Sequence, residues 1–481
     1  MAQRAAANLA LGALLGALAC RGDGSGPPPL TPRIDYVDGA IEPLLVRAAS
    51  AVIEGFGFGD IRGSGTVTFA RTGGGTVIAV VASSGWSDRS IRTVVPDSAV
   101  SGTLTVTTAT GGALTTTVHV LPHVVFDPAT LAWQARTAFP RAPVGVALTA
   151  GTTPAGGSLR VTLYAAGGAE PLGGDSAMVP DSAVFVSRAA PGGPIGIWTR
   201  PHDLPAPRAF ATAAFANRYN SRLDGGALYV IGGIDSAGRA RATVYLAPVI
   251  ADTAVGSFTP IEPLPAPVAG AIAVVRRGRI YVLGGADVLG RPQSNVYVGR
   301  VGVDGHIDGW YVQPALPGPR AYGGGVVLDS RVAAFGGIAD SAPLGGGLTA
   351  APARLALGDT ARVSLVSGFF TGAWASAGAL LPEGRSQFAT LPVGDVALVV
   401  GGMYGGAPSN AAETLAAAVV GDSLSAFAGP IGVNTIAGLG GGTLVGLVGA
   451  SWQDADGSYH GIVVGGIDLV TRLRRDGAWG F

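Results

Sequence analysis

A pair of glycines follows a short apolar run six times in this chain of 481 residues, and this repeat restricts the possible folds more than any other feature. The copies are Leu163–Gly168, Leu228–Gly233, Ile280–Gly285, Val332–Gly337, Ala397–Gly402 and Gly461–Gly466. Their first glycines, at 167, 232, 284, 336, 401 and 465, lie 52 to 65 residues apart. A repeat of this length is one supersecondary unit that cannot bury its apolar faces alone, so neighbouring copies must stack.

A second motif keeps the same phase as the glycine pairs. An aromatic residue is followed six positions later by an apolar residue and then at once by proline, beginning at Trp133, Trp198, Phe258 and Trp310. Trp374 repeats the motif with one residue inserted before Leu381–Pro382, and Phe427 begins a degenerate copy. Two motifs that stay in phase over five or six copies indicate a true structural repeat.

Together the two motifs resemble the kelch-repeat β-propellers, over roughly residues 124–481. In that family the glycine pair closes the second strand of a four-stranded blade, and the aromatic residue packs on the outermost strand. The resemblance implies a propeller domain of six blades over 123–481. Its innermost strands would begin near Arg141, Arg208, Val268, Arg320, Arg385 and Asn434.

The segment before the first innermost strand has a particular role in such a ring. We expect residues 133–139 to return as the outer strand of the last blade, which would leave no free sheet edge. Val124–Pro128 and Asp476–Trp479 also look like strand ends of the repeat. A composite seventh blade is therefore the alternative to six.

Residues 34–122 alternate apolar and polar positions between turns that contain glycine, a pattern typical of a small β-sandwich. This segment resembles the immunoglobulin-like IPT/TIG domains in the stretches Val52–Gly59, Gly65–Phe69, Trp86–Asp88, Val95–Pro96 and Ser101–Val106. The resemblance implies a spacer or a protein-contact module. The expected fold class is all-β, an immunoglobulin-like sandwich followed by a kelch-like propeller.

Residues 1–20 have the features of an export signal. Arg4 precedes an apolar stretch, Leu9–Ala19, that is too short to span a bilayer. The stretch ends in Ala-Leu-Ala-Cys, which resembles the lipobox of bacterial lipoproteins and implies lipid attachment at Cys20. Cys20 is the only cysteine, so it has no disulfide partner within the chain. An ordinary secretory signal cleaved near Ala19 is the alternative.

Residues 21–33 are rich in glycine and serine and then in proline, as expected of a flexible tether. We therefore expect an exported lipoprotein held in a lipid bilayer by its N-terminal acyl anchor. Arg21 stands where inner-membrane lipoproteins commonly carry Asp. By this resemblance, the outer membrane or the cell surface is favoured over the inner membrane.

Four arginines, Arg141, Arg208, Arg320 and Arg385, occupy the same place in four repeats. In kelch propellers this place lies near the mouth of the central channel, so the resemblance implies possible ligand-binding residues that could grip a carboxylate. The alternative is a structural role, with each arginine paired to nearby backbone or Asp. The acidic residues after the glycine pairs are interpreted as turn formers: Glu170, Asp235, Asp287, Asp340 and Asp468.

The sequence predicts no catalytic residue, metal site or cofactor. The five histidines lack ligand spacing, and the single cysteine excludes the tyrosine–cysteine crosslink of copper oxidases that use a kelch propeller. We expect a non-catalytic binding protein whose protein or glycan ligand lies at the channel mouth and loops.

The alternative function is a carbohydrate-active enzyme that resembles the kelch sugar epimerases and works in the channel. Its candidate polar groups are Arg208, Arg320, Arg385, Tyr322 and Glu383. A formal net charge of zero, without any basic run, argues against a nucleic-acid partner in either case.

Overall fold

β-Strands make up nearly all of the regular structure of this protein. The computed structural model describes residues 31–481 apart from residues 142, 156–157, 172–177, 218–224, 251–253, 303, 341–354, 365–366, 405–412, 432–443 and 469–477. Within this part of the chain there is one short 3₁₀-helix, η1 (Pro128–Thr130), and no α-helix, so the expected all-β class is confirmed. No helix in this part is long and apolar enough to cross a bilayer. Cys20 and the expected signal peptide lie outside it, as does the tether as far as residue 30.

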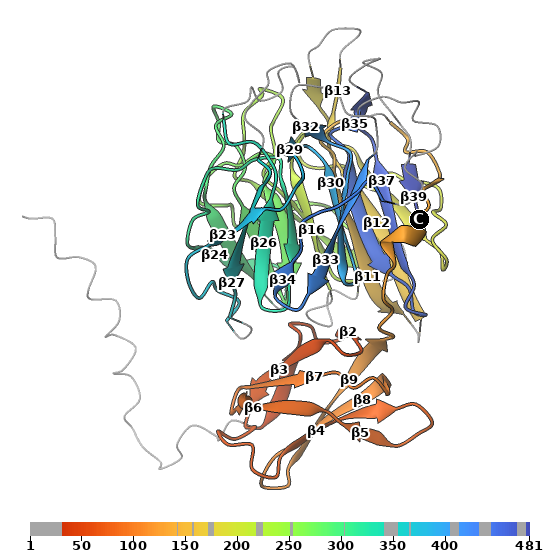
Figure 1. Cartoon of the computed structure of the whole chain (residues 1–481), viewed down its shortest axis with the longest axis vertical. Helices are drawn as coiled ribbons and strands as arrows, with labels where there is room; N and C mark the ends of the chain where they lie inside the picture. Colours follow the sequence, from red (N-terminus) through yellow and green to blue (C-terminus); the bar gives the residue numbers. More distant parts are fainter. Residues whose placement is uncertain are drawn as a thin grey trace, which may run out of the picture.

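Two sheets form a sandwich in the first part of the described chain (Figure 1). One sheet has the order β1 (Arg33–Val37), β3 (Ser50–Phe56), β7 (Ser90–Val94) and β6 (Val80–Ser87). The other has the order β2 (Leu44–Val46), β9 (Ala113–Leu121), β8 (Ala99–Thr107), β4 (Thr66–Arg71) and β5 (Thr76–Ile78). Inward side chains from both sheets, such as Ile53, Phe69 and Leu104, are fully buried and form one core.

Six larger sheets follow in the described part of the chain, together with three two-stranded ones. The first contains β11 (Ala147–Ala155), β12 (Ser158–Ala166) and β15 (Val184–Ala189). The second contains β16 (Thr212–Ala216), β17 (Ala227–Ile231), β18 (Val244–Ile250), β19 (Ala254–Val255) and β20 (Thr259–Ile261). The third contains β21 (Ile272–Arg276), β22 (Arg279–Leu283), β23 (Val296–Val301) and β24 (Ile307–Val312). The next two contain β25 (Gly324–Val327), β26 (Arg331–Phe335), β27 (Leu357–Arg362) and β28 (Ala375–Ala379); and β30 (Ala389–Val393), β31 (Val396–Val400), β33 (Thr414–Val420) and β34 (Ser423–Leu424).

The sixth of these sheets joins distant parts of the chain. Its strands are β36 (Val448–Gln453), β37 (Tyr459–Val464), β39 (Ala478–Gly480) and β10 (Gln134–Ala135). Gln134 pairs with Gly480 and Ala135 pairs with Trp479. The expected return of residues 133–139 to the last sheet is therefore confirmed for Gln134 and Ala135.

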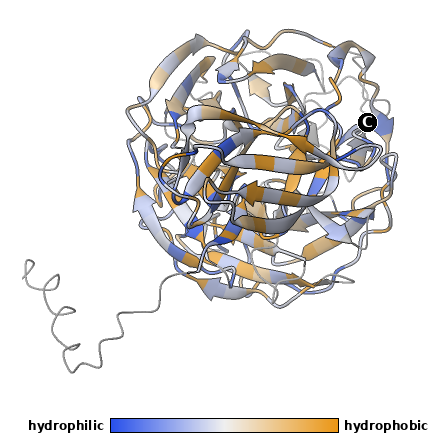
Figure 2. Ribbon diagram, turned by 90° about the horizontal axis from the view of Figure 1, so that it is seen from below, coloured by the Kyte–Doolittle hydropathy of each residue, from blue (hydrophilic) through white to orange (hydrophobic). Residues whose placement is uncertain are grey.

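The first strands of the six sheets form a closed circuit of contacts. They contact one another in the order β11, β16, β21, β25, β30 and β36, and β36 contacts β11 again. Seen from the side of the sandwich, the sheets lie around a common centre behind it (Figure 2). Apolar residues from neighbouring sheets share their buried cores; one such core contains Tyr229 and Ile231 of one sheet and Ile280 and Val282 of the next.

The glycine pairs end the second strands and determine how closely neighbouring sheets approach. Every glycine of the six pairs has a positive φ. A Cβ on Gly284 would lie 2.2 Å from the carbonyl oxygen of Arg320, the residue that precedes the next sheet. The amide of Gly285 donates to the same oxygen at 2.8 Å. A side chain here would separate the sheets and would disfavour the backbone conformation, which explains the glycine pair.

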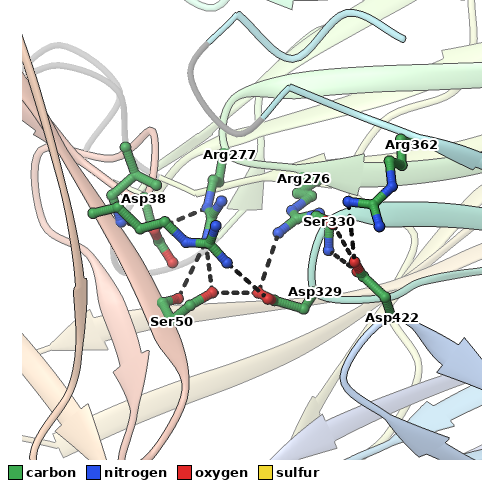
Figure 3. A network of polar contacts seen from close by, with 10 residues as sticks. Asp38, Ser50, Arg276, Arg277, Asp329, Ser330, Arg362 and Asp422 are labelled. Carbon is green, nitrogen blue, oxygen red and sulfur yellow. Dashed lines mark hydrogen bonds and ion pairs between the residues drawn. The ribbon is translucent and has the colours of Figure 1, made fainter. Parts of the chain in front are cut away.

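The sandwich and the six sheets meet through a network of charged and hydroxyl groups (Figure 3). Arg277, in the turn between β21 and β22, donates Nε to Asp38 Oδ1 at 2.9 Å and Nη2 to Ser50 O at 3.1 Å. Asp329, in the turn between β25 and β26, accepts from Arg92 Nη2 at 3.1 Å and from the Ser50 hydroxyl. The Arg277 side chain is only 8% exposed, whereas Arg92 and Asp329 of the same network keep 46% and 33% of their side-chain surface exposed.

The turns after the glycine pairs lie at the other end of the six sheets. β13 (Ala169–Pro171) and β32 (Met403–Tyr404) directly follow two of the pairs. Figure 1 shows both strands at the end away from the sandwich. The short strands β14 (Met178–Pro180), β29 (Arg385–Ser386), β35 (Leu444–Val445) and β38 (Ile467–Asp468) pair with or lie beside them at this end.

Candidate functional site

Arg320 and Arg385 turn into their own sheets. Arg320 Nη2 donates to Asp359 Oδ2 at 2.7 Å, and Arg385 Nη2 donates to Glu413. In each case Nη1 donates to the carbonyl oxygen of the first glycine in the pair of the same sheet. The two arginines are 2% and 3% exposed. Their charges are therefore neutralised by partners inside the protein.

Arg208 and Arg141 also have partners within the protein, but neither forms a buried ion pair. Arg208 Nη2 donates to the Tyr245 hydroxyl at 3.0 Å, and its guanidinium lies 5.2 Å from the centre of that ring. Arg141 pairs with Asp181, and its side chain is 31% exposed. The structure thus gives each of the four arginines its own partner and does not gather them around one position. A carboxylate ligand would have to displace these partners, which favours the structural alternative for the four arginines.

A cavity of about 500 Å³ lies between the first strands of the six sheets. Its walls are mostly small apolar residues and glycines, with the hydroxyls of Thr149, Thr212, Thr390 and Ser451. Among the lining residues that the structure describes there is no carboxylate, imidazole, guanidinium or thiol. The electrostatic character of this cavity is therefore neutral.

Six residues at equivalent places surround one end of the cavity, and we call them the collar. They are Gly145, Phe210, Gly270, Tyr322, Gln387 and Gly446. All six have φ between +52° and +72°. The amide of each residue from Phe210 onward donates to the carbonyl oxygen of the preceding one, at 2.7–3.0 Å. Because the collar precedes the first strands, it lies at the end away from the sandwich.

Two aromatic rings dominate the collar. The rings of Phe210 and Tyr322 meet edge to face, with centroids 5.6 Å apart and an interplanar angle of 87°. A Cβ on Gly145 would lie 2.6 Å from the Phe210 ring, and one on Gly270 would lie 2.4 Å from the Tyr322 ring. Each ring therefore lies over the preceding glycine of the collar, and these glycines leave room for the rings.

Two polar side-chain atoms of the cavity lining lack hydrogen-bond partners among the described residues, whereas the Ser451 hydroxyl donates to the Pro392 carbonyl oxygen. Burial raises the pKa of Tyr322, so its hydroxyl stays protonated through the neutral range and can donate a hydrogen bond. Gln387 Oε1 and Thr390 Oγ1 are shielded from solvent and have no hydrogen-bond partner among the described residues. Unpaired buried polar atoms are costly, so a ligand with hydroxyl groups would stabilise the site if these two side chains turned toward the cavity to meet it.

Sequence reasoning finds only part of this site. It names Tyr322 as a channel residue for the enzyme alternative, but it misses Phe210 and Gln387. A signal was present, since each of the three stands two positions after the arginine of its repeat. Glu383, the other polar group of that alternative, is exposed and is not among the residues that line the cavity.

The acidic residues after the glycine pairs act as turn formers where the structure describes their bonds. Asp287 Oδ1 accepts from the amides of Leu289 and Arg291 at 2.8 and 3.0 Å. Burial opposes the shift, but these bonds and the Arg291 guanidinium hold the pKa of Asp287 below its usual value. Asp235 makes the same turn and also has a lowered pKa. Glu170 and Asp468 lie instead in the short paired strands β13 and β38, so the turn interpretation is wrong for these two, and for Asp340 it stays a prediction.

The histidines form no catalytic or metal-binding group in the part of the chain that the structure describes. No three His, Cys, Asp or Glu side chains there lie close enough to hold a metal ion. His460 Nε2 lies 3.2 Å from Asp454 Oδ2 and 3.2 Å from Ser458 Oγ. Because both contacts use the same nitrogen, the histidine does not relay a proton between acid and hydroxyl.

No family model matches this chain, and no curated protein matches it either. The function must therefore be argued from the geometry of the collar and its cavity.

Proposed function

We propose that this protein is a membrane-anchored, non-catalytic binding protein outside the cytoplasm, with its ligand or partner at the collar end of the molecule. The chemistry of the cavity lining carries this proposal. Among the described lining residues, only Tyr322 has a titratable side chain. General acid–base catalysis needs a donor and an acceptor within reach of the reacting atoms, whereas binding needs only shape and hydrogen-bonding groups.

The architecture that we propose is a six-bladed, kelch-like propeller on an IPT/TIG-like sandwich. The circuit of first strands and the placement of one glycine pair at the end of the second strand of each sheet support it. The segments that suggested a seventh blade also favour six. Residues 478–480 belong to the sixth sheet as β39, and residues 128–130 form η1.

An anchor at Cys20 would place the sandwich beside the membrane and the collar away from it. The described chain enters the sandwich at β1, and the collar lies at the opposite end of the six sheets. We expect the wild-type chain in the membrane fraction, labelled by a radioactive fatty acid, and Cys20→Ser in the soluble fraction without label. Retention of Cys20→Ser on membranes would contradict the anchor. Separation of the two membranes on a density gradient tests the preference for the outer membrane or cell surface.

Glycan and peptide arrays probed with the detergent-solubilised full chain test the binding function. We expect a defined set of glycans or peptides to bind and to be released unchanged, as judged by NMR spectra of each ligand after prolonged incubation. Conversion of a bound sugar to its epimer would instead support the enzyme alternative. An absence of binding on every array would contradict the proposed function.

A further inference from the structure

The backbone conformation of the collar sets three of its residues apart from the glycines. Phe210, Tyr322 and Gln387 have φ of +52°, +58° and +56°, a conformation that L side chains disfavour. The other three collar positions adopt the same conformation with glycine, which carries no such strain. Strained residues of this kind cluster where a site uses their side chains.

The three side chains offer a recognisable set of contacts. Phe210 and Tyr322 present aromatic surface, and both residues are partly exposed at the collar. Tyr322 adds a hydroxyl, and Gln387 Oε1 adds an acceptor with no partner among the described residues. Thr390, on the adjoining first strand, adds a second unpaired oxygen.

The lining excludes charged and purely apolar guests. An ion would lose its hydration without meeting an opposite charge, because the four repeated arginines are paired elsewhere. A hydrocarbon would leave the oxygens of Gln387 and Thr390 unpaired. A cavity of about 500 Å³ is within the usual range for a small ligand. The guest must therefore be small and neutral, with hydroxyl groups on its edge and an apolar face for the rings.

We propose that the collar and its cavity bind one uncharged sugar residue, with its apolar face on Phe210 and Tyr322. Its hydroxyls would bond to the Tyr322 hydroxyl and to Gln387 and Thr390, whose side chains turn toward the ligand. This inference rests on the proposed binding function and gives its ligand class. A free monosaccharide and the terminal residue of a glycan share this chemistry.

The test uses the detergent-solubilised full chain and saturation-transfer NMR, which detects sugar protons close to the irradiated protein. The probes are the methyl glycosides of glucose, galactose, mannose and N-acetylglucosamine, with methyl glucuronide and methyl galacturonide as charged counterparts. We expect at least one neutral glycoside to bind, and both uronides to bind at least tenfold more weakly than it does. An oligosaccharide that carries the same sugar as its terminal, non-reducing residue is tested in the same way. Its binding, compared with that of the free glycoside, distinguishes glycan ends from free sugars as ligands.

Glycine is the informative substitution, because the chain already uses it at equivalent positions. Phe210→Gly, Tyr322→Gly and Gln387→Gly should each weaken binding of that glycoside at least tenfold. Ala48→Gly is the matched control, since Ala48 has φ +61° and lies in the sandwich, so this variant should bind as the wild type does. Tyr322→Phe and Gln387→Met keep the bulk of the side chains and take the place of a glycine variant that does not fold. Each of the two should weaken binding severalfold.

The outcomes separate this inference from the proposed function. If array ligands bind but no neutral glycoside does, or if the collar variants bind as the wild type does, the sugar site is wrong and the binding function stands. Equal binding of glycosides and uronides would also overturn the sugar site as described. If neither arrays nor glycosides show binding, both proposals fail.

Discussion

The collar holds three glycines and three larger residues in one backbone conformation. In this conformation a residue with a Cβ destabilises the folded protein by about 1–2 kcal/mol relative to glycine. At Gly270, φ is +59° and an added Cβ would lie 2.4 Å from the Tyr322 ring. At Gly238, φ is +70° and nothing would lie within 4 Å. Substitutions at the two glycines therefore separate the free-energy cost of the backbone conformation from the cost of crowding the Tyr322 ring.

Gly270→Ala should lower the free energy of unfolding by about 2–4 kcal/mol, because strain and overpacking add. Gly238→Ala should lower it by about 1 kcal/mol, the backbone cost alone. Denaturant titration of both variants and of the wild type measures the difference. Equal losses would mean that the Tyr322 ring moves aside freely and is not held in the collar.

At the scale of the residue, the sequence predicts the backbone conformation only where the residue type itself favours one. The glycine pairs imply tight backbone packing, and the structure agrees, with Gly284 pressed against the Arg320 carbonyl. Phe210 and Gln387 carry no such signal, since neither residue type favours positive φ. Their conformation is imposed by the hydrogen bonds that link neighbouring sheets, which a single sequence does not reveal.

The pairing of Arg320 with Asp359 illustrates what holds one sheet together. The two side chains are 2% and 9% exposed. Arg320 precedes β25 and Asp359 lies on β27, and β26 separates these two strands in the fourth of the six sheets. Removing one partner would leave the other as an unpaired buried charge, which is more costly than the loss of the pair itself.

Arg320→Ala should therefore lower the free energy of unfolding by about 3–5 kcal/mol. Combining Arg320→Met with Asp359→Leu should recover much of that loss, because no charge is then left unpaired. Arg141→Ala is the matched comparison, since its more exposed pair is worth about 1 kcal/mol or less. Urea unfolding of the four proteins provides the measurement. An equal loss in Arg320→Ala and Arg141→Ala would contradict the buried-pair interpretation.

The elements themselves follow closely from the repeat, and their side-chain partners do not. The first strands begin a few residues after Arg208, Arg320 and the other predicted starts, except that Asn434 lies outside the described residues. The sequence alone allows the arginine side chains to point either into a channel or into their own sheets. Their partners, such as Glu413 for Arg385, stand 28 or more residues away and share no motif with them.

The junction between the sandwich and the six sheets includes a carboxyl group that is poorly compensated. Glu54 on β3 lies 3.8 Å from Arg279, and its side chain is 21% exposed. Burial raises the pKa of Glu54, and the attraction of Arg279 offsets this only in part. The folded protein therefore holds this proton more tightly than the unfolded chain does. Stability consequently falls as the pH rises from 4.5 through the raised pKa of Glu54.

Glu54→Gln should raise the melting temperature at pH 7 and leave it nearly unchanged at pH 4.5, the ordinary value for this carboxyl. Arg279 would keep its bonds to the carbonyl oxygens of Ser367 and Arg277. Calorimetric scans between these two pH values measure the effect, with the exposed Glu383→Gln as the control for the lost charge. A lower melting temperature for Glu54→Gln at pH 7 would mean that the pair with Arg279 outweighs desolvation.

At the scale of the molecule, the order of sandwich and sheets could be anticipated and their docking could not. Alternation in residues 34–122 and the repeat beyond them predict two kinds of β-structure. The contact of Asp38 with Arg277 joins residues 239 apart, and each has many possible charged partners in the sequence. Only the folded chain shows that the sandwich lies beside the turns of the third and fourth sheets.

The pairing of β10 with β39 determines when the last of the six sheets can be completed during synthesis. During synthesis β10 emerges first, and its partner strand becomes available only when residues 478–480 have left the ribosome. Until then the open side of β37 and the edge of β10 are unpaired templates for aggregation. We therefore expect the chain to be prone to self-association from the emergence of β10 until residues 478–480 pair with it.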